Sequence, residues 1–332
     1  MLARVIETIY WMARYLERAE NIARLINVNS HLLLDLPKGI SPGWEPLIDI
    51  TGTREQYLGL YTDFSEAHVL TYLVTDIKST ASLRFALNAA RENARTTRDV
   101  IPQEAWEQLN TLYFYASDYI SYAQRKTKRF SYLNTIITYC QTINGLLADT
   151  MNRDAGYLFL QIGRYIERAD MTSRIIDVRT KNLLTQNNHL EFHPFANIQW
   201  MSVLKSMTAY QMYRREVQVN ISQEQVLTFL LKSKVFPRSI YYCIAEVARN
   251  THPLPKSEAV LSLINQTLTS LLSTQASDLK QQSLHMYLDQ IQVFLTQIGD
   301  ELDNTYFPSG QASKCIDPLI KNTLSSVQNQ SL

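Results

Sequence analysis

Apolar residues recur at alternating steps of four and three along most of the chain, the spacing that lines up one apolar stripe on an α-helix. The pattern is clearest in the first segment, from Leu2 to the region before Pro37. Its stripe consists of Val5, Ile9, Met12, Leu16, Ala19, Ala23 and Ile26. Because a proline disfavours helix at the residue before it, the segment is expected to end there. The sequence therefore predicts a long N-terminal helix that packs against neighbouring helices.

The same spacing predicts further helices over the rest of the chain. Their expected positions are near 63–73, 77–100, 103–124, 130–151, 155–184, 199–213, 256–273 and 279–304. Two more are expected to begin at Ser222, which has capping-box spacing, and at Pro237. The main loops are expected at 37–46, 186–194 and 251–255. No run alternates as a strand does, so the predicted fold class is all-α, a multi-helix bundle of about nine or ten helices.

Length and composition are those of a folded domain. The chain has 332 residues, of which 45% are apolar and 19% are charged, so it can bury a core. We expect one helical domain over residues 1–307, with 1–150 and 151–307 as possible pseudo-repeat halves, and a flexible polar tail over 308–332. Nine glycines are few for this length, which disfavours glycine-rich phosphate loops and doubly wound sheets.

Charge and hydropathy narrow the expected partners and location. The 32 Lys+Arg residues nearly balance the 31 Asp+Glu residues, so a protein that coats nucleic acid is not expected. An RNA-binding patch would use the tyrosine-rich stretch around Arg125 and Arg129, but the near-neutral charge favours a helix-hairpin tip there. No apolar run reaches the roughly 20 residues of a membrane helix, and no secretory signal is evident. We therefore expect a cytoplasmic protein without membrane contact, whose three separated cysteines are reduced.

A charged motif occurs twice, at an interval of 150 residues. The first copy spans residues 14–20, Arg-Tyr-Leu-Glu-Arg-Ala-Glu, and the second spans residues 164–170, Arg-Tyr-Ile-Glu-Arg-Ala-Asp. Between 13–24 and 163–174 six of twelve positions are identical, and the apolar stripe continues in the same phase. The sequence thus predicts an internal repeat, two helices that present the same polar face and bury the same apolar face.

The polar face of the first copy carries charges of both signs. It consists of Arg14, Glu17, Arg18, Asn21 and Arg24. Glu17 can pair with Arg14 along the helix, whereas Arg18 needs Glu167 of the other copy or a ligand carboxylate or phosphate. We expect a buried or half-buried network between the two helices, which could also be purely structural. The alternative is a set of exposed ion pairs, which contribute little to stability.

Four stretches resemble the motifs of one bacterial family. Residues 10–21 look like the N-terminal signature of the alpha-E domain family, which is named for its helical fold and its Glu-Arg motif. Residues 162–171 resemble the second Glu-Arg motif of that family. Residues 90–95 resemble its middle signature, and residues 236–239 resemble its C-terminal one. The four stretches come in the family's order and together cover most of the chain.

The resemblance implies a helical fold and a genetic neighbourhood. Genes of the family tend to lie beside, or to be fused to, circularly permuted ATP-grasp ligases and transglutaminase-like peptidases, which suggests a role in making or modifying peptides or amide-linked metabolites. The family's Glu-Arg pairs carry over to Glu17-Arg18 and Glu167-Arg168. Gln161 stands where the first copy has Trp11, so the two copies need not have equal roles.

The residues expected to form a functional network come from all four stretches. They are Arg14, Tyr15, Glu17, Arg18, Asn21, Arg91, Glu92, Asn93, Arg164, Tyr165, Glu167, Arg168, Asp170 and Arg238. Arg238 follows a proline at an expected helix start, where an anion would meet free backbone N–H groups. A solvated helix face is the simpler interpretation of the stretch at 91–93. Six histidines show no metal-ligand spacing, so no metal site, cofactor or catalytic residue is assigned.

Three functions remain open. In the first, the protein is an accessory binding component of an ATP-grasp-linked system for peptide or amide-bond synthesis or modification, and its arginines hold a peptide or small anionic ligand or dock the ligase. In the second, it is an enzyme that uses Glu17 and Glu167 as acid and base, although neighbouring arginines lower the pKa of such carboxylates. In the third, it is a purely structural helical interaction module.

Overall fold

The computed structural model describes residues 2–36, 43–186, 196–217, 221–275, 279 and 281–307. Within these ranges the regular structure consists of fourteen α-helices, one π-helical turn and one 3-10 turn, without a strand. The predicted all-α class is therefore confirmed. The helices are more numerous than the nine or ten that the sequence led us to expect.

Seven α-helices and the two short turns precede residue 152. They are α1 (Ala3–Asp35), α2 (Glu45–Ile50), α3 (Arg54–Leu58), α4 (Glu66–Leu70), the π-helix η1 (Thr71–Thr75), α5 (Leu83–Thr96), α6 (Gln103–Asp118), the 3-10 helix η2 (Ile120–Gln124) and α7 (Lys126–Thr150). Seven α-helices follow. They are α8 (Ala155–Gln186), α9 (Ala196–Ser206), α10 (Tyr210–Val217), α11 (Gln223–Lys232), α12 (Ile240–Thr251), α13 (Glu258–Ser273) and α14 (Gln281–Tyr306).

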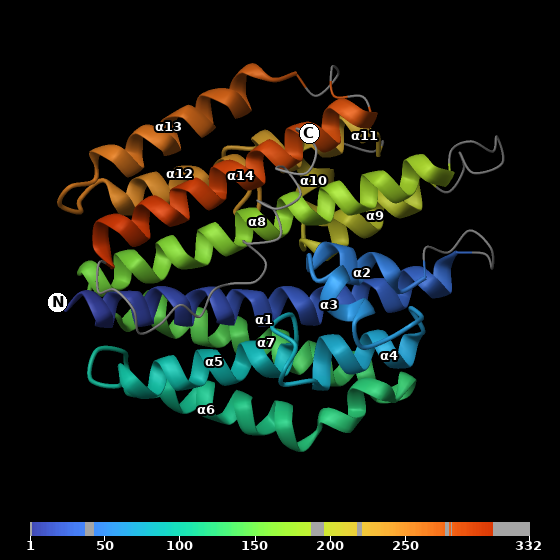
Figure 1. The fold of residues 1–332 in the computed structure, drawn as a ribbon, viewed down its shortest axis with the longest axis horizontal. Coiled ribbons are helices and arrows are strands. Elements are labelled where there is room, and N and C mark those ends of the chain that lie inside the picture. The colour runs from blue at the N-terminus through green and yellow to red at the C-terminus, as the bar shows by residue number, and fades with distance from the viewer. Residues whose placement is uncertain are drawn as a thin grey trace.

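Two long helices, α1 and α8, lie side by side through the middle of the molecule and run in the same direction (Figure 1). On one side α5 and α7 pack against α1, and α6 packs on both of them. On the other side α12 and α14 pack against α8, and α13 packs on those two. Each central helix is thus covered by its own helical layer, while the division into halves at residue 150 stays a prediction.

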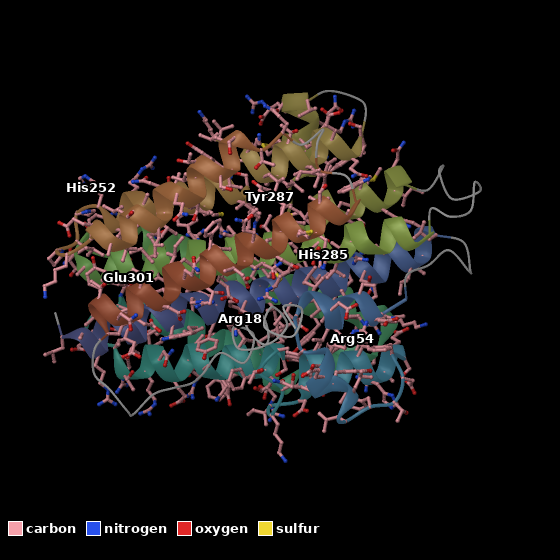
Figure 2. The ribbon with its side chains drawn as sticks, turned by 45° about the horizontal axis from the view of Figure 1, so that its top comes forward. Arg18, Arg54, His252, His285, Tyr287 and Glu301 are labelled. Carbon is pink, nitrogen blue, oxygen red and sulfur yellow. The ribbon has the colours of Figure 1, made fainter. Side chains whose placement is uncertain are left out.

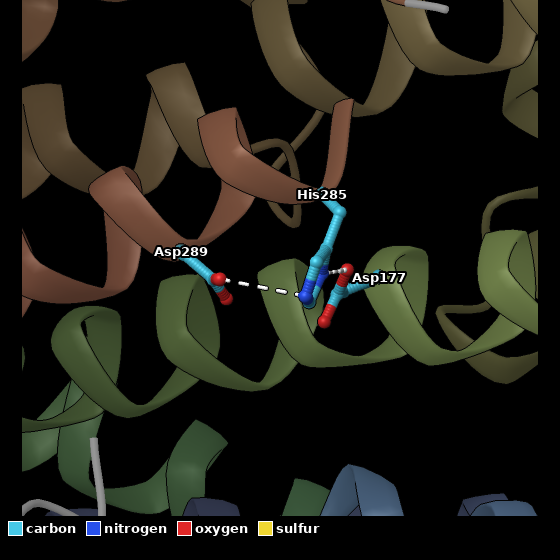
Figure 3. A group of neighbouring side chains, drawn as sticks. All are labelled: Asp177, His285 and Asp289. Carbon is cyan, nitrogen blue, oxygen red and sulfur yellow. Dashed lines mark hydrogen bonds and ion pairs between the residues drawn. The ribbon is translucent and has the colours of Figure 1, made fainter. Parts of the chain in front are cut away.

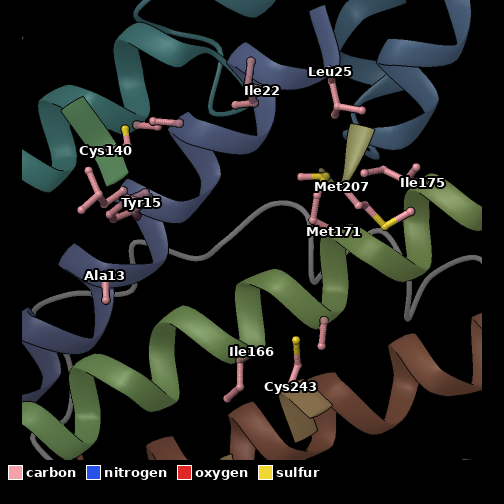
Figure 4. Packing of buried hydrophobic residues seen from close by; sticks show 14 of the residues in the cluster. Ala13, Tyr15, Ile22, Leu25, Cys140, Ile166, Met171, Ile175, Met207 and Cys243 are labelled. Carbon is pink, nitrogen blue, oxygen red and sulfur yellow. The ribbon is translucent and has the colours of Figure 1, made fainter. Parts of the chain in front are cut away.

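The apolar stripe predicted on the first segment is buried along α1. Ile9, Met12, Leu16, Ala19, Ala23 and Ile26 are at most 1% exposed. The equivalent stripe on α8 is buried too, and it consists of Phe159, Ile162, Ile166, Ala169 and Ile176. Figure 4 shows Leu25 of α1 gathered with Met171 and Ile175 of α8, close to Met207. The repeated apolar phase therefore fixes which faces of the two helices enter the core.

Two short helices, α2 and α3, escaped the sequence pattern because their six and five residues are too few to repeat it. The helix expected near 63–73 is present as α4 followed by the π-helical turn η1. The helix expected over 199–213 is divided into α9, which ends at Ser206, and α10, because Thr208 between them has a positive φ of 55°. A positive φ is unfavourable for a β-branched residue, so the backbone is strained at this break.

Serine caps begin two of the later helices. The Ser222 side chain accepts a hydrogen bond from the backbone N–H of Gln225 at the start of α11, as the capping-box spacing predicts. The helix expected to begin at Pro237 begins at Ile240 instead. The Ser239 side chain provides its cap by accepting from the N–H of Tyr242, so residues 236–239 form a turn that leads into α12.

Some expectations fall partly or wholly outside the described residues. These are the loops at 37–46 and 186–194 and the tail over 308–332.

Cys140 and Cys243 are free and buried, in keeping with reduced cysteines. None of the described helices combines the length and apolarity that a bilayer-spanning segment requires. Figure 2 shows His285, Tyr287 and Glu301 along α14.

The central helices approach each other closely at Gly163 of α8. A Cβ atom at this position would overlap the carbonyl oxygen of Tyr10 on α1 and would also press on the tyrosine ring. Ala13 occupies the equivalent position in the first copy of the motif. Glycine at position 163 therefore permits a backbone approach that a side chain would prevent.

Replacing Gly163 by alanine should separate the two central helices. We expect Gly163→Ala to lower the free energy of unfolding by about 1–3 kcal/mol, because the added methyl group overpacks a backbone contact. Gly299→Ala on α14 is the matched control, since a Cβ there meets nothing within 4 Å. The control should stabilise the protein by about 0.5–1 kcal/mol through helix propensity. Urea denaturation measures both, and equal effects would contradict the close approach.

Candidate functional site

The two Glu-Arg pairs face each other across the α1–α8 interface and exchange partners. Arg168 of α8 donates from Nε and Nη2 to Glu17 of α1, at 2.8 and 2.7 Å. Arg18 of α1 donates from Nε and Nη2 to Glu167 of α8, at 2.5 and 3.0 Å. Both pairs are bidentate and use the same atoms, so the parallel helices are related locally by a pseudo-twofold axis. Each copy of the motif thus completes the other.

A second arginine of each copy breaks this symmetry. Arg14 Nε donates to Glu167 Oε2 at 2.9 Å. The equivalent Arg164 Nε lies 3.8 Å from Glu17 Oε2, beyond hydrogen-bond distance. Across the part of the chain that the structure describes, this buried Nε atom has no hydrogen-bond partner. The copies are therefore equivalent in their Glu-Arg pairs and different at the arginine three residues earlier.

Arg238, from the turn before α12, is the additional cation on the Glu17 side. Its Nη1 donates to Glu17 Oε1 at 3.1 Å and to Asn21 Oδ1 at 2.9 Å, and its Nη2 donates to Glu20 Oε1 at 2.7 Å. The anions that Arg238 meets are thus carboxylates of α1. Its contacts place the turn at 236–239 over the second turn of the Glu-Arg motif.

The network is withdrawn from water. Glu17 and Glu167 are each 1% exposed, and Arg18 is 2% exposed. Burial by itself raises the pKa of Glu17, but Arg168, Arg238 and Arg164 outweigh it and hold the pKa of this carboxyl well below its ordinary value. Glu17 is therefore ionised at neutral pH. The predicted buried inter-helix network is present, and the alternative of exposed pairs is wrong for these residues.

Tyrosine rings flank the two bidentate arginines in matching positions. The Arg18 guanidinium lies 5.5 Å from the centre of the Tyr15 ring, and the Arg168 guanidinium lies 5.5 Å from the centre of the Tyr165 ring. Burial raises the pKa of Tyr165 to about 12, so its hydroxyl stays protonated. In both copies the ring three residues before the arginine packs against that guanidinium and holds its plane.

The pairing along each helix differs from the expectation. Glu17 makes no pair with Arg14 among the described contacts, and it pairs with α8 and the α12 turn instead. The pairs within a helix form one turn later, where Arg24 meets Glu20 at 2.6 Å. In the second copy Arg174 meets Asp170 at 2.9 Å. The carboxylate of Asp170, a predicted member of the functional network, pairs with Arg174 of its own helix, and its functional role stays a prediction.

A comparison with known protein families matches nearly the whole chain. The model of Alpha-E, described as "a predicted alpha-helical domain with a conserved ER motif", covers residues 1–307. The chain belongs to the Alpha-E family. Glu17-Arg18 and Glu167-Arg168 fit the motif in that description, and in this structure they are the residues that pair across α1 and α8.

Curated relatives of this Alpha-E chain are uncharacterised. One is a protein of Mycobacterium bovis and another is a protein of Mycobacterium tuberculosis, each 22% identical over 278 residues. The match covers 76% of this chain and 30% of each relative. The chain thus spans about a third of the length of the curated relatives it matches. No solved structure matches the chain.

A cavity of about 410 Å³ lies beside the Glu17 half of the network, between α7, α8 and the turn before α12. Its polar lining consists of Glu20, Gln141, Asn144, Arg164, Arg168 and Arg238. Three arginines therefore face one glutamate around this space. Thr208, the strained residue between α9 and α10, and Phe236 form part of the remaining wall. The unpartnered Arg164 Nε belongs to this side of the network.

The middle signature of the Alpha-E chain lies elsewhere. Arg91 donates to Asn110 of α6 at 2.7 Å and to Glu92 at 3.0 Å, and its guanidinium lies 4.7 Å from the centre of the Tyr113 ring. The Asn93 carbonyl accepts from hydroxyls of its own helix. Among the described residues these three make no ion pair or hydrogen bond with the Glu-Arg network, so the structure does not bring them into it.

Sequence reasoning missed several polar residues of the site. Glu20 belongs to the repeated motif, but its contact with Arg238 spans 218 residues and no spacing reveals it. Gln141 and Asn144 come from α7, whose sequence carries no charged signature. Sequence reasoning also missed a second group, Asp177 with His285 and Asp289. The four-residue spacing of His285 and Asp289, one turn apart on α14, is the signal in the sequence that could have revealed it.

Removing one buried carboxylate should destabilise the protein far more than removing a peripheral one. Glu17→Gln leaves Arg168 without its charge partner and removes one of the two carboxylates that Arg238 meets, and we expect it to cost about 3–5 kcal/mol of unfolding free energy. Asp170→Asn breaks a pair at the edge of the network, and we expect a loss below about 1 kcal/mol. Urea denaturation at neutral pH compares them. Equal losses of unfolding free energy would show that burial does not determine how much each ion pair contributes to stability.

The depressed pKa of Glu17 also predicts a dependence of stability on acid. A carboxyl whose pKa is lower in the folded state stabilises the fold above its unfolded pKa, about 4.3, and this contribution is lost as the pH falls toward the folded pKa. The unfolding free energy of the wild type should therefore decrease below about pH 4.3 more steeply than that of Glu17→Gln. Denaturation curves at several pH values test this, and parallel profiles would contradict it.

Proposed function

We propose that this Alpha-E domain is a binding component that holds a carboxylate or phosphate group of a peptide or amide-linked metabolite in the cavity beside its Glu-Arg pairs. The domain serves a system that forms or modifies amide bonds with the help of an ATP-grasp ligase. The cavity and its arginines support the first part of the proposal. The motif resemblance to a family with such gene neighbours supports the second.

The observation that carries the proposal is the buried Nε atom of Arg164, which has no hydrogen-bond partner among the residues that the structure describes. A buried guanidinium N–H without a partner is costly, and a ligand oxygen would satisfy it. The equivalent atom in the first copy, Arg14 Nε, donates to Glu167 at 2.9 Å. A hydrogen bond to an anion is therefore what this position of the motif can make. A carboxylate or phosphate at the mouth of the cavity would restore for Arg164 the contact that Arg14 has.

Size and charge of the cavity agree with a small anionic ligand. Its volume of about 410 Å³ lies in the range of small-molecule sites, roughly 300–1,000 Å³. Arginines outnumber carboxylates in its lining three to one. The amide side chains of Gln141 and Asn144 offer donors and acceptors that suit a peptide bond. The anionic group would meet Arg164, and the rest of the ligand would lie along α7.

Acid–base catalysis by the paired glutamates is the weaker candidate. Glu17 is 1% exposed, and its oxygens are occupied by Arg168 and Arg238. A carboxylate whose pKa is held well below its ordinary value is a poor proton acceptor at neutral pH. Cys243 is an equally poor nucleophile, because burial raises the pKa of its thiol to about 12. Both observations favour ligand binding over catalysis at this site.

Partners of the domain are part of the proposal. By family resemblance they are a circularly permuted ATP-grasp ligase and a transglutaminase-like protein. The curated relatives are about three times as long as the matched region, which leaves room in them for further domains. The domain would present a bound peptide or metabolite to the ligase, whose own ATP chemistry would supply the amide bond.

Arg164→Gln is the variant that tests ligand binding with least damage to the fold, because its side chain is 21% exposed and has no hydrogen bond to lose at Nε. The probes are inorganic phosphate and a tripeptide with a free carboxylate, measured by isothermal titration calorimetry. We expect at least a tenfold loss of affinity for the probe that binds, since a hydrogen bond to a charged group contributes about 1.5–3 kcal/mol. Arg95→Gln, an exposed arginine on α5, is the charge-matched control.

Gly145→Leu on α7 tests the cavity itself. A Cβ at position 145 meets nothing within 4 Å, and the residue lines the cavity, so leucine should fill the space without disturbing the helix. It should abolish probe binding, whereas Gly299→Leu on α14 should not. Failure of both probes to bind the wild type would contradict the proposal. So would Arg164→Gln and Gly145→Leu variants that bind a probe as tightly as the wild type does. Arg168→Ala is unsuitable, because that arginine is buried and bidentate.

A further inference from the structure

A histidine and two aspartates converge where α14 packs on α8. His285 Nδ1 lies 2.6 Å from Asp177 Oδ1 of α8, and His285 Nε2 lies 3.5 Å from Asp289 Oδ2 of α14. Figure 3 shows the imidazole ring between the two carboxylates. One potential ligand atom from each residue lies within 4.8 Å of the others. The group is separate from the Glu-Arg network and from its cavity.

The local sequence explains how three donors meet here. His285 and Asp289 are four residues apart, so they lie one turn apart on the same face of α14. That face is the one that α14 turns toward α8, where Asp177 projects from the facing helix. Two helices thus each hold part of the group, and helices hold such side chains more rigidly than loops do.

The donor set suits a transition-metal ion. Imidazole nitrogen and carboxylate oxygen are the ligands that bind Zn²⁺ besides thiolate, with bonds of about 2.0–2.2 Å. Two ligands of a tetrahedral ion with such bonds lie roughly 3.3 Å apart, close to the 3.5 Å between His285 Nε2 and Asp289 Oδ2. The hydrogen bond from His285 Nδ1 to Asp177 resembles the carboxylate contact that usually orients a zinc-bound histidine.

Charge and exposure agree with a cation at this place. The two aspartate carboxylates place negative charge on both sides of the imidazole, which favours a cation at this place. Asp177 is 14% exposed, whereas His285 and Asp289 are 47% and 44% exposed. The inner aspartate is therefore held by the fold, and the outer two ligands leave a path from solvent.

We propose that Asp177, His285 and Asp289 form a binding site for one Zn²⁺ ion where α14 packs on α8. His285 Nε2 and Asp289 coordinate the ion directly. Asp177 accepts the hydrogen bond from His285 Nδ1 and orients the imidazole, and water completes the coordination. The site is independent of the cavity ligand, so either proposal can fail without the other.

Zinc titration of the full chain without a histidine tag tests the site by isothermal titration calorimetry. We expect one Zn²⁺ per chain for the wild type, at least a tenfold loss of affinity for His285→Ala and for Asp289→Asn, and a loss of about 10–100-fold for Asp177→Asn. His68→Ala is the matched control, because His68 is similarly exposed and pairs with a single carboxylate, Asp63 at 2.9 Å. This control should bind Zn²⁺ as the wild type does.

Melting temperature provides the second readout. Zn²⁺ should raise the melting temperature of the wild type and of His68→Ala, and it should leave that of His285→Ala unchanged, since only an ion bound to the folded state stabilises it. Absence of binding to the wild type would overturn the proposal and leave the group as an ion pair around a protonated histidine. Binding that His285→Ala and Asp289→Asn do not weaken would overturn it as well.

Discussion

Two glutamates buried between parallel helices must each find a guanidinium, and this requirement organises the molecule. Taking a carboxylate and an arginine out of water costs several kcal/mol per ion, which only close and well-oriented pairing offsets. The two helices exchange partners: Arg168 donates to Glu17 at 2.8 and 2.7 Å, and Arg18 donates to Glu167 at 2.5 and 3.0 Å, through the same atoms. A displacement of either helix along the other would break both bidentate contacts together. The pairs therefore fix the register of α1 against α8.

Other features of the fold follow from this register. Gly163 lets the backbones approach closely enough for short side-chain contacts, and the tyrosines at 15 and 165 brace the guanidinium planes. Outer helices on both sides exclude water, which strengthens the charge pairing. The pseudo-symmetry fails on the cavity side, where Arg238 reaches Glu17 and Arg164 stands off at 3.8 Å. In the proposed function, this departure from symmetry is what leaves one half of the network available to a ligand.

The features that could be predicted from the sequence are those that regular residue spacing determines. The apolar stripe of α1 and the 150-residue repeat could be read from spacing. For Arg18 spacing left two partners open, Glu167 or a ligand anion, and the structure shows Glu167. Contacts between distant segments could not be read from spacing, because no local rule brings Arg238 to Glu20 or Gln141 to the cavity. Asp170 shows the same limit, because spacing grouped it with the repeated motif and the structure pairs its carboxylate with Arg174 of its own helix.

The most direct test of the reciprocal pairing is a double-mutant cycle on Glu17 and Arg168, measured by urea denaturation. The account predicts that Glu17→Gln and Arg168→Gln are each strongly destabilising and that the double variant loses far less than their sum, with a coupling energy of about 2–3 kcal/mol. The same cycle on Asp170 and Arg174 should give about 0.5 kcal/mol or less. A coupling near zero for Glu17 and Arg168 would contradict the claim that these charges stabilise one another across the helix interface.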